Sequence, residues 1–142
     1  MERRDVVVTG AGALAPNGST REEFWSGVSN GVSGVQDISD RLRDDEEFPV
    51  QFAAVVDGYD SDDYFSTKQA KRLDQFVQFG IIAAEEAIED AGFDLEDPEY
   101  DSKRAGVVYG SGVGGLQTLE EQHERFLERG PRRVSPYLVP KF

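Results

Sequence analysis

Residues 105–116 read AGVVYGSGVGGL, and the rest of the expected fold is arranged around them. The first five residues are mostly apolar and include two valines, which predicts a buried strand. Glycine then occupies positions 110, 112, 114 and 115. Such a density indicates a backbone with positive φ, or one that another group approaches closely. Residues 116–128 follow with helical periodicity, and strand, glycine-rich loop and helix in this order are typical of sites in α/β proteins.

The composition limits what the protein can be. Its 142 residues suffice for one domain with a core. Cysteine is absent, so these residues form no disulfide, no thiolate metal site and no cysteine nucleophile. One histidine, His123, cannot make a multi-histidine metal site, and we expect no metal and no cofactor. No run approaches the roughly 18 apolar residues of a membrane span, and the polar first residues do not open a signal peptide. We therefore expect a cytoplasmic protein.

The net charge of the chain is strongly negative. Asp and Glu number 28 against 15 Lys and Arg, a net charge of −13, which argues against a nucleic-acid partner. Only four of the 15 basic residues are lysines. A carboxylate-rich, lysine-poor surface fits a cell that keeps molar salt inside, and it also fits an ordinary solvated acidic surface.

Further elements are expected along the chain. Residues 5–9 and 51–56 predict strands, joined by a turn at 31–35 and a polar connection over 36–50. A helix should start after Ser19 or Thr20, with Glu22 or Glu23 completing a capping box, and Gly31 should stop it. Its apolar face is expected to contain Phe24, Trp25 and Val28.

The longest periodic segment covers residues 67–91, which predicts one helix with Gly92 as its stop. A short helical turn over residues 60–66 should precede it and anchor Tyr64 and Phe65 in the core. In the last expected helix one apolar face is formed by Leu116, Leu119, His123, Phe126 and Leu127. His123 has no serine or cysteine partner nearby in sequence, so we expect a structural role for it.

Two glycine motifs leave a dinucleotide-binding domain open as an alternative. Residues 10–15 match G-x-G-x-x-A and residues 110–115 match G-x-G-x-x-G, each after an expected strand. The first is followed by the turn signal Pro-Asn-Gly, where that fingerprint requires a helix. The second lacks the acidic residue that the fingerprint places at the end of the next strand. A P-loop is excluded, because the sequence has no glycine-lysine-serine or glycine-lysine-threonine run.

Basic residues gather in two places of this acidic chain. Three of them, Lys68, Lys71 and Arg72, lie at spacings i, i+3 and i+4, and so are expected to share one helix face. The two groups are Lys68, Lys71 and Arg72, and Arg129, Arg132 and Arg133. Either these cations balance local carboxylates or they form a docking surface for an acidic partner.

Five segments together resemble a known family. They are VVVTGAGALAPNG (6–18), EEFWSGVSNGVSGV (22–35), KQAKRLDQFVQFGIIAAEEAIEDAG (68–92), GVVYGSGVGGLQTLEEQ (106–122) and GPRRVSPYLVP (130–140). In order and spacing they resemble the amino-terminal part of β-ketoacyl-acyl-carrier-protein synthases, over nearly the whole chain. The resemblance implies an α/β, thiolase-like fold, in which two similar halves stack as α/β/α/β/α layers and the full enzyme is a homodimer. Residues 1–142 would be an incomplete amino-terminal half of it.

The resemblance also implies an acyltransferase. Such synthases condense an acyl thioester with malonyl-carrier protein, with decarboxylation, in fatty-acid or polyketide biosynthesis. Their cysteine nucleophile, two histidines and lysine all come after the segment that ends at Pro140. We therefore expect no catalytic residue in this chain, and no activity from it alone. A non-catalytic short protein that binds a carrier protein, or pairs with a full synthase, remains the alternative.

Several residues match family positions with a role. Val113 and Leu138 match positions of the acyl pocket, and Tyr137 and Leu138 match positions at the dimer interface. The positions that meet the acyl carrier protein are matched by Lys68, Lys71, Arg72, Arg132 and Arg133.

A third of a layered fold should not be stable alone. A sheet without its neighbouring strands exposes unpaired edges and an uncovered apolar face. We predict that the isolated chain is aggregation-prone, partly molten or dependent on a partner.

Overall fold

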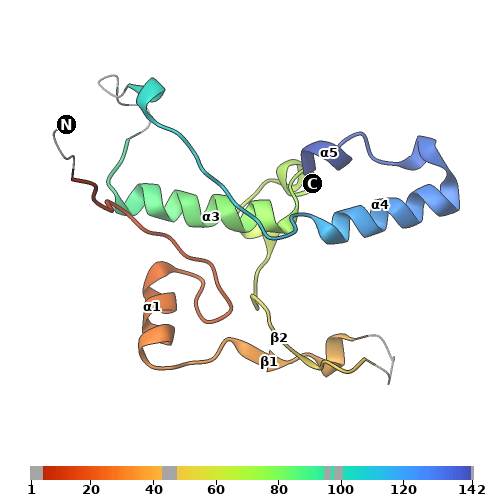
Figure 1. The fold of residues 1–142 in the computed structure, drawn as a ribbon, viewed down its shortest axis with the longest axis horizontal. Coiled ribbons are helices and arrows are strands. Elements are labelled where there is room, and N and C mark those ends of the chain that lie inside the picture. The colour runs from red at the N-terminus through yellow and green to blue at the C-terminus, as the bar shows by residue number, and fades with distance from the viewer. Residues whose placement is uncertain (1–4, 43–47, 95–96, 98–100, 142) are drawn as a thin grey trace. The chain divides into compact units, whose positions relative to one another are not determined.

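The computed structural model describes residues 5–42, 48–94, 97 and 101–141. Its contacts divide the chain into two compact units. The first consists of Met1–Tyr59 and Ile82–Asp94, and the second of Asp60–Ile81 and Leu95–Phe142. The long helix α3 (Gln75–Asp90) contributes residues to both (Figure 1).

In the first unit, helix α1 (Arg21–Ser29) starts as the sequence predicts. The Glu23 amide donates to Oγ1 of the N-cap Thr20 at 3.3 Å, and the Glu23 carboxylate accepts from the Ser19 amide at 2.9 Å. Thr20 is therefore the N-cap, but the predicted capping box is not complete, because Glu23 binds the amide of Ser19 and not that of Thr20. The helix ends before Gly31, whose φ of +68° suits glycine. The expected apolar face is not buried at Trp25 or Val28, which are 68% and 48% exposed.

A small hairpin also belongs to the first unit. Strands β1 (Val35–Asp37) and β2 (Phe52–Ala54) pair antiparallel, with Gln36 opposite Ala53. The expected strand over 51–56 is confirmed only in its centre, and the partner strand β1 was not predicted. Asp57 fastens the hairpin, because it accepts from Gln36 Nε2 and from Arg41 Nη2, both at 2.6 Å. Arg41 ends the short 3-10 helix η1 (Ser39–Arg41).

The first glycine motif is explained by its approach to α3. A Cβ atom on Gly10 would lie 2.1 Å from the Ala87 carbonyl oxygen, and one on Gly12 only 1.9 Å from that of Ala83. Two carboxylates of α3 hold the same segment. Glu86 accepts from the Ala13 amide at 2.7 Å, and Asp90 from the Ala11 amide at 3.0 Å. These glycines thus let the chain pack against a helix.

The end of α3 matches the prediction. Gly92 has a φ of +60°, its amide donates to the Glu89 carbonyl at 2.9 Å, and the Phe93 amide donates to the Ile88 carbonyl at 3.2 Å. These two bonds form a Schellman motif, which requires the left-handed backbone that glycine adopts.

Arg21 ties the start of α1 to α3. Its amide donates to Glu86 Oε1 at 2.8 Å, and its guanidinium pairs with Asp90 and Glu22. The hydrogen bond from Arg21 holds the pKa of Asp90 below its ordinary 3.8, with the Ala11 amide adding to it. The same guanidinium lowers the pKa of Glu22. A carboxyl group whose pKa is lower in the folded state stabilises that state above its unfolded pKa, and this contribution is lost as pH falls through the folded value.

We therefore predict a pH-dependent effect of Arg21→Gln. The substitution should destabilise the protein at neutral pH, and the difference from the wild type should shrink as pH falls below about 4. Urea unfolding at a series of pH values measures it. Arg104→Gln removes the same charge from an exposed residue without a side-chain ion pair among the described residues, and should show no such trend. A constant difference across the pH range would contradict the prediction.

In the second unit, the expected helix over 67–91 is interrupted. Helix α2 (Thr67–Ala70) follows the 3-10 helix η2 (Ser61–Asp63), and α3 begins only at Gln75. The amide of the buried Gln78 side chain donates to the carbonyls of Ala70 (3.2 Å) and Leu73 (2.9 Å). These bonds satisfy carbonyls at the break, so two helices replace one. Tyr64 was expected in the core, but it is 49% exposed.

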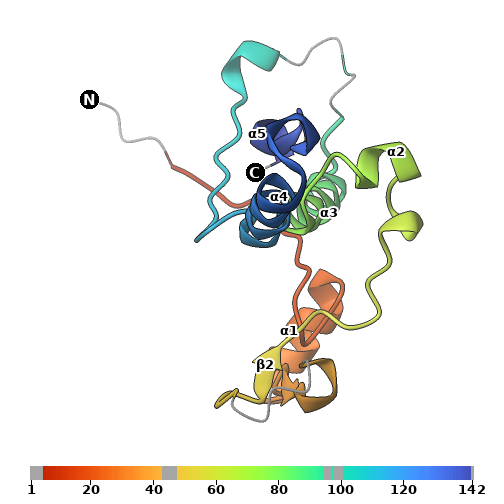
Figure 2. The same ribbon diagram turned by 90° about the vertical axis from the view of Figure 1, so that its right-hand side faces the viewer.

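The second unit continues with a 3-10 helix η3 (Ser102–Arg104) and helix α4 (Leu116–Arg129). After η4 (Pro131–Arg133), helix α5 (Leu138–Lys141) lies beside α4 (Figure 2). Helix α4 is confirmed, but its expected apolar face is not buried, because Leu116, Phe126 and Leu127 are 44–68% exposed. Thr118 and Gln122 are buried in their place, and both have hydrogen-bond partners: Asp74 and the Ser135 amide. Hydrogen bonds to Asp74 and Ser135, which lie outside α4, therefore determine which face of α4 is buried.

The strands expected over 5–9 and 105–109 do not form. Both segments lack the pairing of a sheet, and Val6, Val8 and Val107 are 93%, 89% and 92% exposed. Among the described residues, Ile82 is the one hydrophobic residue that counts as buried. The pattern of a buried strand is present in the sequence, but no described segment lies alongside to accept its backbone hydrogen bonds. The predicted aggregation of the isolated chain remains a prediction.

Candidate functional site

The predicted basic residues all lie in the second unit, and all are exposed. Lys68 lies on α2, Lys71 is the C-cap of that helix, and Arg72 follows it. Arg132 and Arg133 lie in η4. We call Lys68, Lys71, Arg72, Arg132 and Arg133 the basic surface.

Tyr137 links the two parts of this surface. The Arg72 guanidinium lies over its ring, 5.0 Å from the centroid, and Nη2 donates to its hydroxyl at 3.3 Å. A cation over an aromatic face is attracted by the ring quadrupole. Because Tyr137 follows Arg132 and Arg133 after a short connection, this contact brings the end of α2 to the segment behind η4.

Tyr137 is 46% exposed, Leu138 is half-buried and Val113 is 64% exposed. Leu138 shares a cavity with Lys71, whereas Val113 lies in the glycine loop before α4. Their expected roles in an acyl pocket and a dimer interface remain predictions.

The glycine loop over 110–115 has one position that requires glycine for its conformation. Gly114 has a φ of +71°, and its amide donates to Ser111 Oγ at 2.9 Å. A Cβ on Gly110 or Gly112 would meet no atom within 4 Å in the structure, so the expected close approach is not present at these two positions. Tyr109, just before the loop, donates its hydroxyl to the Phe76 carbonyl at 2.6 Å and so attaches the loop to α3.

Metal sites and membrane-spanning helices are both absent from the described ranges. No group of three or more His, Cys, Asp or Glu side chains there is placed to hold a metal ion. None of the helices described combines the length and hydrophobicity needed to cross a membrane. His123 is exposed on α4.

Sequence reasoning missed two cations, Arg125 and Lys141. They line the cavity that also contains Lys71 and Leu138. Arg125 stands among the acidic residues of α4, and Lys141 lies in a helix of four residues, so no periodicity or spacing identified either.

Comparison with known proteins gives consistent matches. The family model described as the beta-ketoacyl synthase N-terminal domain matches residues 3–142. A 3-oxoacyl-[acyl-carrier-protein] synthase 2 of Vibrio cholerae is 44% identical over 140 residues, which cover 99% of this chain and 33% of that protein. The protein of the same name from Staphylococcus aureus strain N315 is 40% identical over 139 residues, 98% of this chain and 33% of its own length. The chain thus spans about a third of the curated relatives it matches.

Solved structures agree on the fold. The ishigamide ketosynthase/chain length factor gives a TM-score of 0.73 at 25% identity, covering 99% of this chain and 34% of that one. A type II polyketide ketosynthase complex with its acyl-carrier protein, bound to a hexaketide, gives 0.72 at 24% identity and covers 94% and 34%. The α/β, thiolase-like fold expected from the sequence is confirmed by these neighbours.

Proposed function

Since this chain belongs to the β-ketoacyl synthase family, whose N-terminal-domain model matches residues 3–142, we propose that it is part of a 3-oxoacyl-[acyl-carrier-protein] synthase. In the condensation that such a synthase catalyses, the malonyl unit on a carrier protein loses carbon dioxide, its α-carbon forms a bond to the acyl carbonyl carbon, and the acyl C–S bond breaks to release the thiol. Support comes from relatives named for this activity at 40–44% identity over almost the whole chain. Fatty-acid or polyketide biosynthesis would use the product.

The part of this chain in the reaction would be to bind the carrier protein. The basic surface carries this proposal: five exposed cations share one unit of a chain whose net charge is −13. Complementary charge guides a partner to its docking site and fixes its orientation more than it adds affinity. An acidic partner fits such a surface, and one structural neighbour is a ketosynthase in complex with its acyl-carrier protein.

The proposal predicts a separation of kinetic constants in the protein at its native length. Lys71→Glu and Arg132→Glu should each raise KM for the carrier-protein substrate by about tenfold and leave kcat within about twofold, because they act on encounter and docking. Steady-state condensation rates measure this. Lys103→Glu, in η3, makes the same charge change outside the basic surface and serves as the control. An equal rise in KM for all three variants would contradict docking at this surface.

The remaining predicted residues extend the proposal. Val113 and Leu138 would contact the acyl chain, and Tyr137 and Leu138 would meet a second subunit of a homodimer. The support is the match to family positions, together with the exposure of Tyr137 and Val113.

The alternative is a protein that binds a carrier protein or a full synthase without catalysis. The intact mass of the protein from its own cells separates the two. A mass well above 15.7 kDa supports the synthase, and a mass of 15.7 kDa with no turnover supports the binding protein.

A further inference from the structure

The second unit contains a cavity of about 200 Å³ between α4 and α5, lined in part by Lys71 of the basic surface. Three cations line it: Lys71 from the end of α2, Arg125 from α4 and Lys141 from α5. The other lining residues are Thr118, Glu121, Gln122, Ser135 and Leu138. We call this the cationic cavity.

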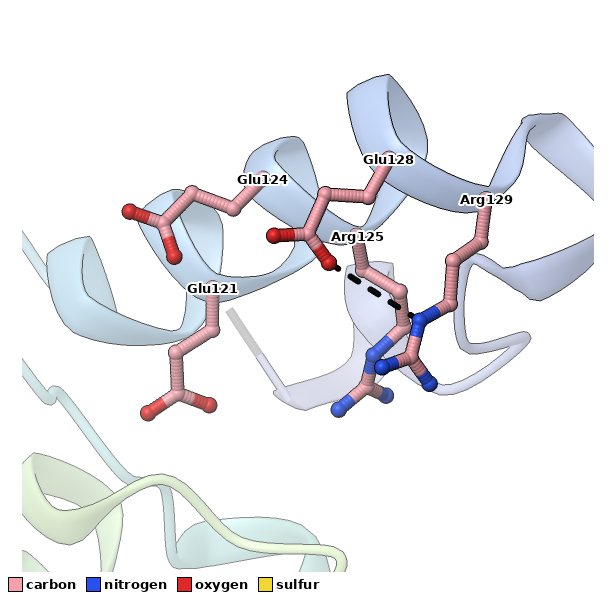
Figure 3. Close-up of a pocket in the computed structure, with 5 residues that line it drawn as sticks. All are labelled: Glu121, Glu124, Arg125, Glu128 and Arg129. Atoms are coloured by element: carbon pink, nitrogen blue, oxygen red, sulfur yellow. Dashed lines mark ion pairs between the residues drawn. The ribbon is translucent and has the colours of Figure 1, made fainter.

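None of the three cations has a carboxylate partner among the described residues. Glu121 is the one acidic residue in the lining, and its carboxylate accepts from Gln117 Nε2 at 3.1 Å. On the same helix, Arg129 does pair with Glu128, at 3.8 Å. Figure 3 shows that pair and the Arg125 side chain without one.

The floor of the cavity is fixed by buried polar groups. Thr118 is 6% exposed and donates its hydroxyl to Asp74, and Gln122 is 7% exposed and accepts from the Ser135 amide at 2.8 Å. These bonds occupy the Thr118 hydroxyl proton and the Gln122 oxygen. The bond from Ser135 to Gln122 therefore holds α4 to the segment over 135–141, which carries Lys141.

We propose that the cationic cavity binds a phosphate group. Lys71, Arg125 and Lys141 supply hydrogen-bond donors and positive charge from three parts of the chain that line one cavity, which suits a doubly charged oxyanion with several acceptor oxygens. Arg125 provides the planar guanidinium that binds phosphate in a bidentate manner. The phosphate is either the free ion or part of a phosphorylated small molecule, and binding needs no carrier protein.

The test is a titration followed by ³¹P NMR at low ionic strength, on the protein at its native length and without carrier protein. Inorganic phosphate should bind saturably, and Arg125→Gln and Lys141→Gln should each weaken it by about tenfold, because each removes a charge-assisted hydrogen bond. Arg129→Gln removes the same charge one helical turn away and should change affinity less than about twofold. Lys141→Arg keeps the charge and should retain binding. Circular dichroism identifies any variant that fails to fold.

Ethyl phosphate separates the two sources. Equal binding of ethyl phosphate and inorganic phosphate assigns the cavity to phosphorylated ligands, and binding of inorganic phosphate alone assigns it to the free ion. The proposal is overturned if the folded wild type does not bind phosphate saturably, or if Arg129→Gln weakens binding as much as Arg125→Gln. Lys71 belongs to both the cavity and the basic surface, but Arg125 and Lys141 lie outside the basic surface, so failure of the phosphate test leaves the KM test with Arg132→Glu intact.

Discussion

Gly12→Ala should destabilise the protein by roughly 3 kcal/mol, the upper part of the range for overpacking a close contact. The added Cβ would lie 1.9 Å from the Ala83 carbonyl oxygen and 2.8 Å from the Ala87 amide nitrogen. Both atoms belong to the backbone of α3, so no side chain can rotate away. The segment over 10–13 would have to leave the helix, and with it the hydrogen bonds that Glu86 and Asp90 accept from its amides.

Urea unfolding of the protein at its native length measures this loss. Gly106→Ala is the matched control, because a Cβ there meets no atom within 4 Å and its φ is not positive. It should change stability by no more than about 0.5 kcal/mol. Equal midpoints for the two variants would disprove the close approach at Gly12.

Thr118→Val should cost about 2 kcal/mol, the value of a hydrogen bond to a charged group. The side chain is 6% exposed, and valine has nearly its shape, so the main loss is the bond to the Asp74 carboxylate. Asp74 also accepts from the Phe76 amide at 3.4 Å, at the start of α3. The substitution therefore leaves a carboxylate oxygen without its donor where α3 and α4 meet in the second unit.

The comparison with Thr118→Ser separates the hydroxyl from the methyl group. Serine keeps the donor and loses only the methyl, so it should retain most of the stability, with a loss of about 1 kcal/mol for the buried methyl. Chemical unfolding of both variants gives the two values. If serine destabilises as much as valine, packing accounts for the effect and the Asp74 bond contributes little.

Local signals predicted the helix ends well. Thr20 with Glu23 starts α1 and Gly92 ends α3, because caps depend on a few neighbouring residues. The break between α2 and α3 was missed, since it is stabilised by Gln78, four or more residues further along the chain. The buried face of α4 was wrong for a similar reason: Asp74 and Ser135 decide it from other elements.

For the strands and the candidate site as well, local sequence patterns predicted some features and missed those that depend on residues distant in the chain. The valines of 5–9 and 105–109 have the pattern of buried strands, but burial also requires neighbours that the described chain does not supply. Spacing indicated that Lys68, Lys71 and Arg72 lie near one another, but α2 ends at Ala70 and Arg72 lies beyond it, so they do not share one helix face, and their docking role stays a prediction. The cationic cavity was not predictable, because its cations converge only when the segment behind η4 returns to α4.

The exposure of Val6 and Val8 also matters during synthesis of the chain. Val6 and Val8 are synthesised before the rest of the described residues, and they are 93% and 89% exposed. Translation proceeds at about 5–20 residues per second, so the synthesis of this length of chain takes on the order of ten seconds. Throughout that interval this exposed apolar segment is open to the same segment on a neighbouring nascent chain of the polysome. The order of synthesis therefore favours pairing between copies, and a low translation density on the messenger would reduce it.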